Sequence, residues 1–139
     1  MNRVHWQSLA EERVLAAQAL LAAQQWSSAY YLAGYAVEFG LKSCILVHVE
    51  ATGVIFKEKK YSEQCWSHDV AELVSLAGLE AQLDAEMAAN FAFRDNWLIV
   101  KAWNEKSRYD MQTQTKAEEL YIAITDATKG VMPWIRSRW

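Results

Sequence analysis

The chain has 139 residues, a length that fits a single domain spanning residues 1–139. Hydrophobic residues make up 53% of it and charged residues 22%, a composition that excludes a disordered chain. Fourteen basic against 17 acidic side chains give a net charge of −3, so bulk charge does not favour coating of nucleic acid, although it is compatible with a local site. One proline and five glycines are too few for a β-sandwich or barrel with many tight turns.

Signals for export and membrane insertion are not visible in the sequence. The segment 1–6 leads into an amphipathic stretch rather than an apolar core with a cleavage site. The longest nearly apolar run, 29–49, is interrupted by three polar residues: Glu38, Lys42 and Ser43. We therefore expect no membrane span. The cysteines Cys44 and Cys65, in a chain without export features, predict a reduced, cytoplasmic setting.

Helical periodicity predicts the first two helices at 8–26 and 28–50. Ser8 is followed three residues later by Glu11, a capping-box pattern that places the start of the first helix at Ser8. Ser28 can cap the second helix in the same way. That second helix is apolar nearly all round, so we expect it at the centre of a bundle.

The second half of the chain predicts shorter helices. Residues 51–66 lose the helical pattern and form a charged loop, after which Ser67 can cap a helix. The remaining expected helices are 68–77, 80–93 and 114–128. The segment 95–110 is less regular, and 134–139 form a short amphipathic tail whose Arg and Trp side chains could contact nucleic acid or a dimer partner. The predicted architecture is an all-α, up-and-down bundle of four to five helices.

Two features of the second helix point to close contacts. Gly34 and Gly40 each cost about 1 kcal/mol of helix propensity relative to alanine, so we expect another element to approach them closely. Glu38 lies among apolar residues, where a carboxylate is costly unless it is paired. Lys42, four residues on, can meet it on one helix face. The pair is either a solvated strip or part of a pocket in which Arg108 is a possible partner.

A second candidate site is the segment 103–110, which places aromatic and charged side chains ahead of the last helix. Arg108 beside Tyr109 and near Trp103 can bind a phosphate while a ring stacks on a base. Alternatively, Trp103 and Tyr109 close the end of the bundle and Arg108 pairs with backbone carbonyls or an acid. Residue types alone leave both interpretations open.

A third candidate is a zinc site. Two thiols and two imidazoles form a set that tetrahedral zinc accepts: Cys44, His48, Cys65 and His68. Within each half the residues are three or four apart. Cys44 can equally be a small core residue, and His68 a common residue at a helix start. We expect no metal and no other cofactor.

Three segments together resemble HEPN domains, a family of nucleotide-binding helical domains found in higher eukaryotes and prokaryotes. Residues 26–42 resemble the signature helix of the family. His68-Asp69-Val70, followed by a helix ending at 77–79, resembles a second motif. Trp103 with Ser107-Arg108-Tyr109 ahead of the last helix resembles a third. Their order and spacing match from about residue 8 to residue 128.

The resemblance implies a small helical bundle, frequently a homodimer, that acts in prokaryotic defence or toxin–antitoxin systems, often beside a small nucleotidyltransferase partner. Many members are metal-independent ribonucleases whose signature is an Arg followed, after four to six residues, by a His. In this chain the corresponding positions after Arg108 are Thr113, Gln114 and Thr115, and no other Arg has a His at that spacing. The motif therefore lacks the His that would act as general acid or base, a group that typically raises the reaction rate roughly 10²–10⁴-fold.

Three functions stay open on these grounds. The first is a non-catalytic HEPN-like domain that binds nucleotide, RNA or a nucleotidyltransferase partner. The second is a metal-independent ribonuclease with an altered site, which uses either Arg108, Tyr109 and Glu38 or a His68 contributed from elsewhere in the fold. The third is a pure dimerisation or interaction bundle. The ligand-binding candidates are Glu38, Lys42, Trp103, Arg108 and Tyr109, followed by His68 and Asp69.

Overall fold

A computed structural model describes residues 2–54 and 59–139, and this part of the chain contains eight α-helices, one 3₁₀ helix and no strand. In chain order the elements are α1 (Arg3–Ala22), α2 (Trp26–Thr52), α4 (Lys59–Gln64), α5 (Val70–Leu76), α6 (Glu80–Ala89), α7 (Phe91–Lys101), η1 (Glu105–Tyr109), α8 (Gln114–Thr125) and α9 (Val131–Arg136). The prediction of an all-α helical bundle is confirmed. More helices form than the predicted four or five, because short helices occupy segments that were expected to be irregular.

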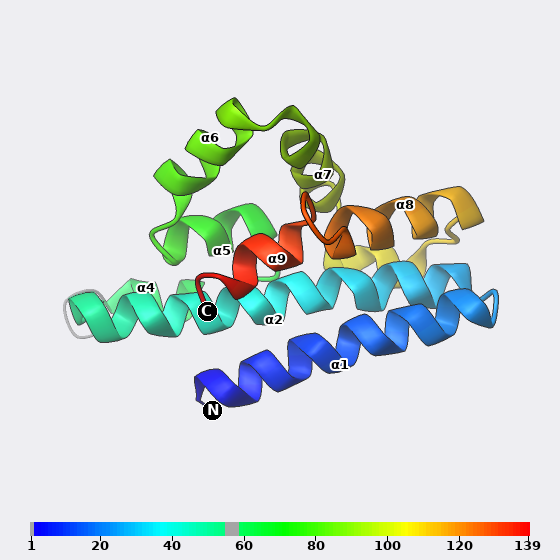
Figure 1. Ribbon diagram of the computed structural model, residues 1–139. Helices are drawn as coiled ribbons and strands as arrows, with labels where there is room; N and C mark the ends of the chain where they lie inside the picture. The colour runs from blue at the N-terminus through cyan, green and yellow to red at the C-terminus, as the bar shows by residue number, and fades with distance from the viewer. Residues whose placement is uncertain (1, 55–58) are drawn as a thin grey trace.

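The long helix α2 is the centre of the bundle, as its apolar character predicts. It runs antiparallel to α1 and also contacts α5, α8, α9 and η1 (Figure 1). By length and composition alone α2 could cross a membrane, and 61% of its most apolar window is buried inside the fold. The core helix of a globular bundle has the same length and composition.

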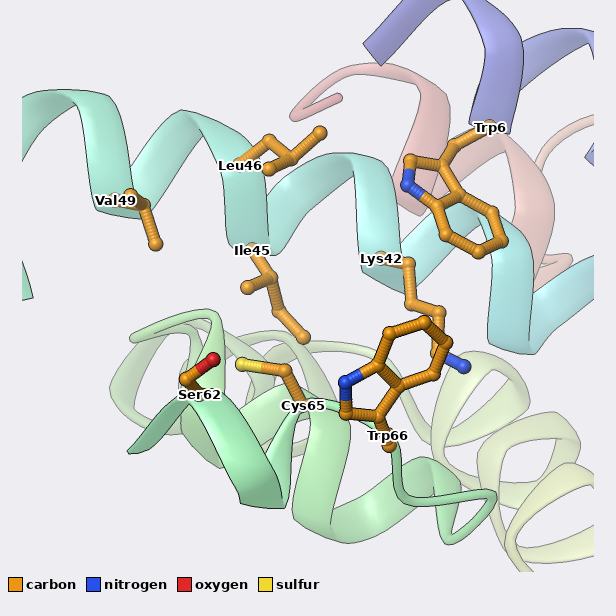
Figure 2. Close-up of a pocket in the computed structure, with 8 residues that line it drawn as sticks. All are labelled: Trp6, Lys42, Ile45, Leu46, Val49, Ser62, Cys65 and Trp66. Carbon is orange, nitrogen blue, oxygen red and sulfur yellow. The ribbon is translucent and has the colours of Figure 1, made fainter. Parts of the chain in front are cut away.

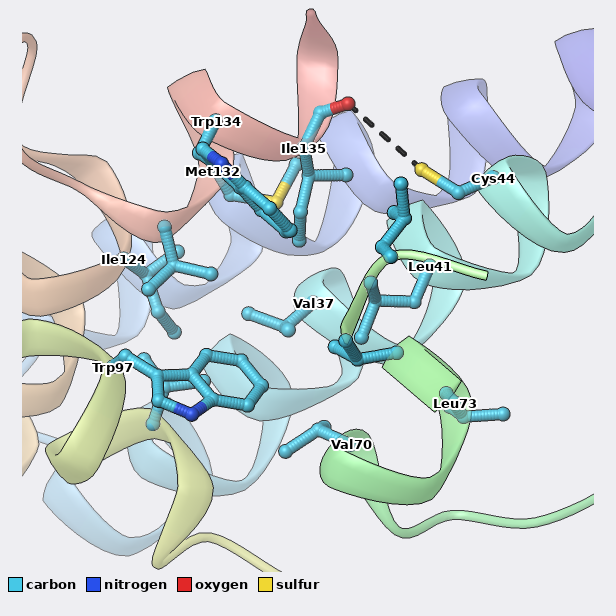
Figure 3. Close-up of a cluster of buried hydrophobic side chains, with 14 of the residues drawn as sticks. Val37, Leu41, Cys44, Val70, Leu73, Trp97, Ile124, Met132, Trp134 and Ile135 are labelled. Carbon is cyan, nitrogen blue, oxygen red and sulfur yellow. Dashed lines mark hydrogen bonds between the residues drawn. The ribbon is translucent and has the colours of Figure 1, made fainter. Parts of the chain in front are cut away.

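The main core lies between α2, α5, α7, α8 and α9, and α9 crosses α2 on one side of it (Figure 3). Three α9 side chains are fully buried there: Val131, Met132 and Ile135. Gly40 allows this approach, because a Cβ at that position would lie 2.9 Å from Cγ2 of Ile135. The expected close contact at Gly40 is therefore present, and its partner is the short helix α9.

The predicted starts of the first two helices are wrong. The α1 helix begins at Arg3, where the side chain of Asn2 accepts a hydrogen bond from the His5 backbone N–H at 2.9 Å. Ser8 therefore lies inside the helix and cannot cap it. The α2 helix begins at Trp26, before Ser28. A polar cap is only one way to satisfy the first backbone N–H groups of a helix: Asn2 caps α1, and α2 begins without a side-chain cap.

Segments 51–66 and 80–93 also differ from prediction. Part of the expected loop is α4, which is held to α5 because the Tyr61 hydroxyl donates to the Leu76 carbonyl; residues 55–58 of that loop lie outside the described residues. The α5 helix is capped by Asp69 and not by Ser67. The expected helix 80–93 is broken at Asn90, whose side chain accepts from the Phe93 N–H and starts α7.

The end of the chain folds back on the bundle. The α8 helix stops at Thr125 rather than residue 128, because the Asp126 carboxylate accepts from the backbone N–H groups of the following turn. Trp134 of the tail is buried, and the Arg138 guanidinium lies 4.3 Å from the centre of its ring. Arg136 donates to Glu11 of α1 through two nitrogens, at 2.7 and 2.9 Å. These side chains are engaged within the chain.

Replacing Arg136 by alanine should lower the free energy of unfolding by about 1 kcal/mol. The bidentate pair with Glu11 joins α9 to α1, but the two side chains are 34% and 43% exposed, so solvent screening limits its strength. Urea denaturation at low and high salt measures the effect. Equal stabilities of the variant and the wild type at low salt would contradict this contribution, and Arg94→Ala serves as the control for loss of one exposed cation.

Candidate functional site

Four polar and aromatic side chains form one stripe along α2: Tyr31, Tyr35, Glu38 and Lys42. They recur every three or four residues, so they share a helix face. The predicted Glu38–Lys42 contact is present, with Lys42 Nζ 3.4 Å from Glu38 Oε2. The segment 66–69 and η1 pack against this face and supply further polar groups.

Glu38 is a buried carboxylate, with 1% of its surface exposed. Its second oxygen, Oε1, lies 2.7 Å from Nδ1 of His68. The expected alternative, Arg108 as partner, is wrong, because the partners of Glu38 are Lys42 and His68. A buried carboxylate is stable only when its charge is compensated, so these two residues explain how Glu38 is tolerated in the core.

His68 continues the chain of contacts to the surface. Its other ring nitrogen, Nε2, lies 3.2 Å from Oε2 of Glu105 on η1, and the edge of Tyr35 faces its ring at 6.1 Å between centroids. The imidazole is thus held between two carboxylates from different elements. When it carries both protons it can donate to each of them.

A polar pocket of about 410 Å³ opens beside His68. Its walls come from the turn before α5, the end of α7 and the start of η1, and they include Lys101, Asn104 and Lys106. Asp69 also lines the pocket, but its carboxylate is used as the cap of α5, where it accepts from the Glu72 N–H at 3.1 Å. The secondary candidates His68 and Asp69 therefore lie together at this pocket.

Trp103 is a structural residue that underlies the site. Its indole is buried against Gly34, where a Cβ would lie 2.0 Å from Cε2, and it contacts Tyr35 edge-on with ring centroids 5.3 Å apart. The expected close approach at Gly34 is thus made by a side chain rather than a helix. The Trp103 Nε1–H and the Ser107 hydroxyl are buried without a protein partner among the described residues. Trp103 cannot stack on a base from this position.

Arg108 and Tyr109 lie on the surface at the end of η1. The guanidinium lies 4.7 Å from the centre of the Tyr109 ring, and Tyr109 is 75% exposed. Hydrogen bonds to Tyr109 and to Tyr31 raise the pKa of Arg108, so its charge is permanent. This pair, unlike Trp103, is exposed to solvent and can meet a ligand.

The four residues of the possible zinc site are engaged in different places. The Cys44 thiol faces the Ile135 carbonyl at 3.9 Å, His48 lies beneath Gly78, Cys65 is half-buried beside α2, and His68 bonds to Glu38. Among the described residues, no group of three or more His, Cys, Asp or Glu side chains is placed to hold a metal ion.

The two thiols should differ in reactivity. Burial raises the pKa of the Cys44 thiol to about 12, and it also raises that of the half-buried Cys65. Thiolate is the reactive form, so at pH 8 we expect an aromatic disulfide reagent to modify Cys65 slowly and Cys44 only after unfolding. Cys65→Ser should remove the native reaction. Two rapidly reacting thiols in the native protein would contradict the packing of Cys44.

Several functional neighbours were missed from the sequence. Glu105 was not recognised as a partner of His68, and Lys101 and Lys106 were not assigned to a pocket. These residues are far from position 68 along the chain, and only the fold of η1 against α2 brings them together.

The chain matches no protein-family model, no curated protein and no solved structure. The candidate site is therefore defined by its own geometry: an oriented imidazole, a polar pocket and an exposed arginine–tyrosine pair.

Proposed function

We propose that this chain is a HEPN-like helical domain that binds the phosphate groups of RNA or of a nucleotide at the pocket beside His68. One observation carries the proposal: two cations, Lys101 and Lys106, line this pocket, a third, Arg108, follows on η1, and none of them has an acidic partner among the described residues. Lys101, Lys106 and Arg108 are exposed, and none lies within 4.0 Å of a carboxylate oxygen of the described residues. Unpaired cations in one place attract phosphates.

The two carboxylates that line the pocket are each engaged within the protein. Glu105 faces His68, and Asp69 is bonded to the first turn of α5. The exposed Tyr109 ring beside Arg108 offers a face on which a base can stack, which adds affinity without sequence preference. The order of the three HEPN-like sequence motifs supports the same class of ligand.

Binding of a fluorescently labelled single-stranded RNA, followed by anisotropy, tests this proposal. The double variant Lys106→Ala/Arg108→Ala should bind at least about tenfold more weakly than the wild type, and log K should depend less steeply on log[salt], by about 0.7 for each phosphate that the variant no longer neutralises. Arg94→Ala is the control, because Arg94 is an exposed cation near the start of α7, whereas the pocket lies at the end of that helix. Equal weakening by both changes would contradict a local site.

A second candidate is a metal-independent ribonuclease, and the orientation of His68 favours it. The buried Glu38 fixes Nδ1, so Nε2 points toward Glu105 at the side of the pocket. Where the 2′-hydroxyl of a ribose takes the place of Glu105 at Nε2, the imidazole can accept its proton. The 2′-oxygen then attacks the adjacent phosphorus, the bond from phosphorus to the 5′-oxygen breaks to leave a 2′,3′-cyclic phosphate, and the 5′-oxygen takes a proton from the imidazolium. The chemistry needs no Arg–His spacing in the sequence, because His68 comes from another element.

Cleavage of total RNA and of a tRNA pool in excess chelator distinguishes the two candidates. If the site is catalytic, His68→Ala should abolish cleavage while RNA binding persists. If it only binds, neither the wild type nor any variant cleaves RNA, and the Lys106/Arg108 variant still loses affinity. Cleavage that persists in His68→Ala would exclude His68 as the acid–base group.

A further inference from the structure

A second pocket, separate from the phosphate site, ends at the ammonium group of Lys42 (Figure 2). One wall is aliphatic and comes from α2: Ile45, Leu46 and Val49. Two indoles face this wall, Trp6 from α1 and Trp66 from the turn after α4, and the small side chains of Ser62 and Cys65 line the remaining side. The pocket is therefore mainly apolar and holds a single charged group, the Lys42 ammonium.

The size of this pocket limits its occupant. Its volume is about 160 Å³. An apolar protein cavity of about 150 Å³ is large enough to hold benzene. One aromatic ring with a small substituent fills such a space.

Lys42 has hydrogen-bonding capacity that the protein leaves unused. An ammonium group has three N–H donors, and here one carboxylate oxygen, on Glu38, accepts at 3.4 Å. Charge-assisted bonds are usually about 2.7–2.9 Å long, so this contact is loose. The Trp6 and Trp66 ring centroids lie 5.4 and 6.0 Å from Nζ. The buried ammonium group can therefore still donate hydrogen bonds to a second, closer carboxylate.

Trp66 stands beside the pocket as an uncovered aromatic side chain. It is 73% exposed, although its ring faces the Lys42 ammonium. A flat ligand lying against it would remove apolar surface from water. An aromatic occupant also gains from edge or stacked contacts with the two indoles.

We propose that this pocket binds a small aromatic carboxylate, with the ring among Trp6, Trp66 and the aliphatic wall and the carboxylate on Lys42. The site does not depend on the RNA or nucleotide function. It shares with that function only Glu38, which contacts both Lys42 and His68.

Benzoate and its neutral analogue benzamide test the site by two-dimensional NMR of the indole N–H groups. Benzoate should shift the Trp66 and Trp6 signals saturably, and benzamide should bind at least about tenfold more weakly, because it lacks the charge that Lys42 recognises. Equal affinities, or shifts confined to other tryptophans, would overturn the proposal. So would the absence of saturable shifts with benzoate.

Two variants separate the contributions. Trp66→Ala should weaken both compounds, while Phe91→Ala, which removes another exposed aromatic ring on α7, should change neither. Lys42→Gln should remove the preference for benzoate, and if this variant does not fold, the comparison of the two compounds on the wild type still decides. Lys106→Ala/Arg108→Ala should bind benzoate normally, so failure of the phosphate site does not affect this test.

Discussion

Replacing Glu38 by methionine is expected to lower the free energy of unfolding by about 3–5 kcal/mol, the cost of removing one partner of a buried ion pair. Methionine fills a similar volume, so the loss reports charge rather than a cavity. Lys42 would lose the carboxylate at 3.4 Å and His68 the one at 2.7 Å. Urea denaturation followed by far-UV circular dichroism measures the change.

A double-mutant cycle with Lys42→Met provides the control. The double variant should be more stable than the sum of the two single losses predicts, because neither charge is then left unpaired in the core. Strict additivity would mean that the Glu38–Lys42 contact contributes nothing. In that event the compensation of the buried Glu38 charge would come from His68 alone.

Replacing Gly34 by alanine should cost about 3 kcal/mol, at the upper end of what overpacking a core usually costs. The new methyl carbon would lie 2.0 Å from Cε2 of Trp103 and 2.2 Å from Cδ2, so the ring would have to move. Trp103 is held by Tyr35, whose own ring contacts His68, so we expect the site to be disturbed as well. Near-UV circular dichroism and urea denaturation measure the two effects.

Gly40→Ala is the matched control for this change. Both glycines lie in the interior of α2, so both variants gain about 1 kcal/mol of helix propensity. At Gly40 the closest atom would be the Ile135 methyl Cγ2 at 2.9 Å, a milder overlap than that with the indole. Gly34→Ala should therefore be the less stable variant by about 2 kcal/mol. If Trp103 is the obstacle, adding Trp103→Phe should recover part of the loss.

The central helix was predictable because its signal is long and repeats at every turn. The short helices were not, since each depends on one or two tertiary contacts. The α4 helix is fixed through Tyr61, and α9 through the burial of Ile135. Local caps were ambiguous for a related reason: Ser67 and Asp69 are both good caps, and the sequence does not show which backbone N–H groups need one.

The candidate site was predictable as a set of residues but not as a set of partners. The pair Glu38–Lys42 follows from helical spacing, which fixes both side chains on one face. His68 as partner of Glu38 depends on how the turn before α5 meets α2, and spacing carries no information about that. Trp103 and Arg108 were both ligand-binding candidates in one short segment, yet Trp103 is buried against α2 and Arg108 is exposed on η1.

The crossing of α9 over α2 has a consequence for synthesis of the protein. Cys44 and its contact Ile135 are 91 positions apart, so the apolar face around Gly40 stays uncovered until most of this domain has left the ribosome. Contacts between such distant segments slow folding and lengthen exposure to aggregation. Nascent chains halted before residue 131 should therefore recruit holdase chaperones to α2, and chains that extend through residue 135 and have cleared the exit tunnel should release them.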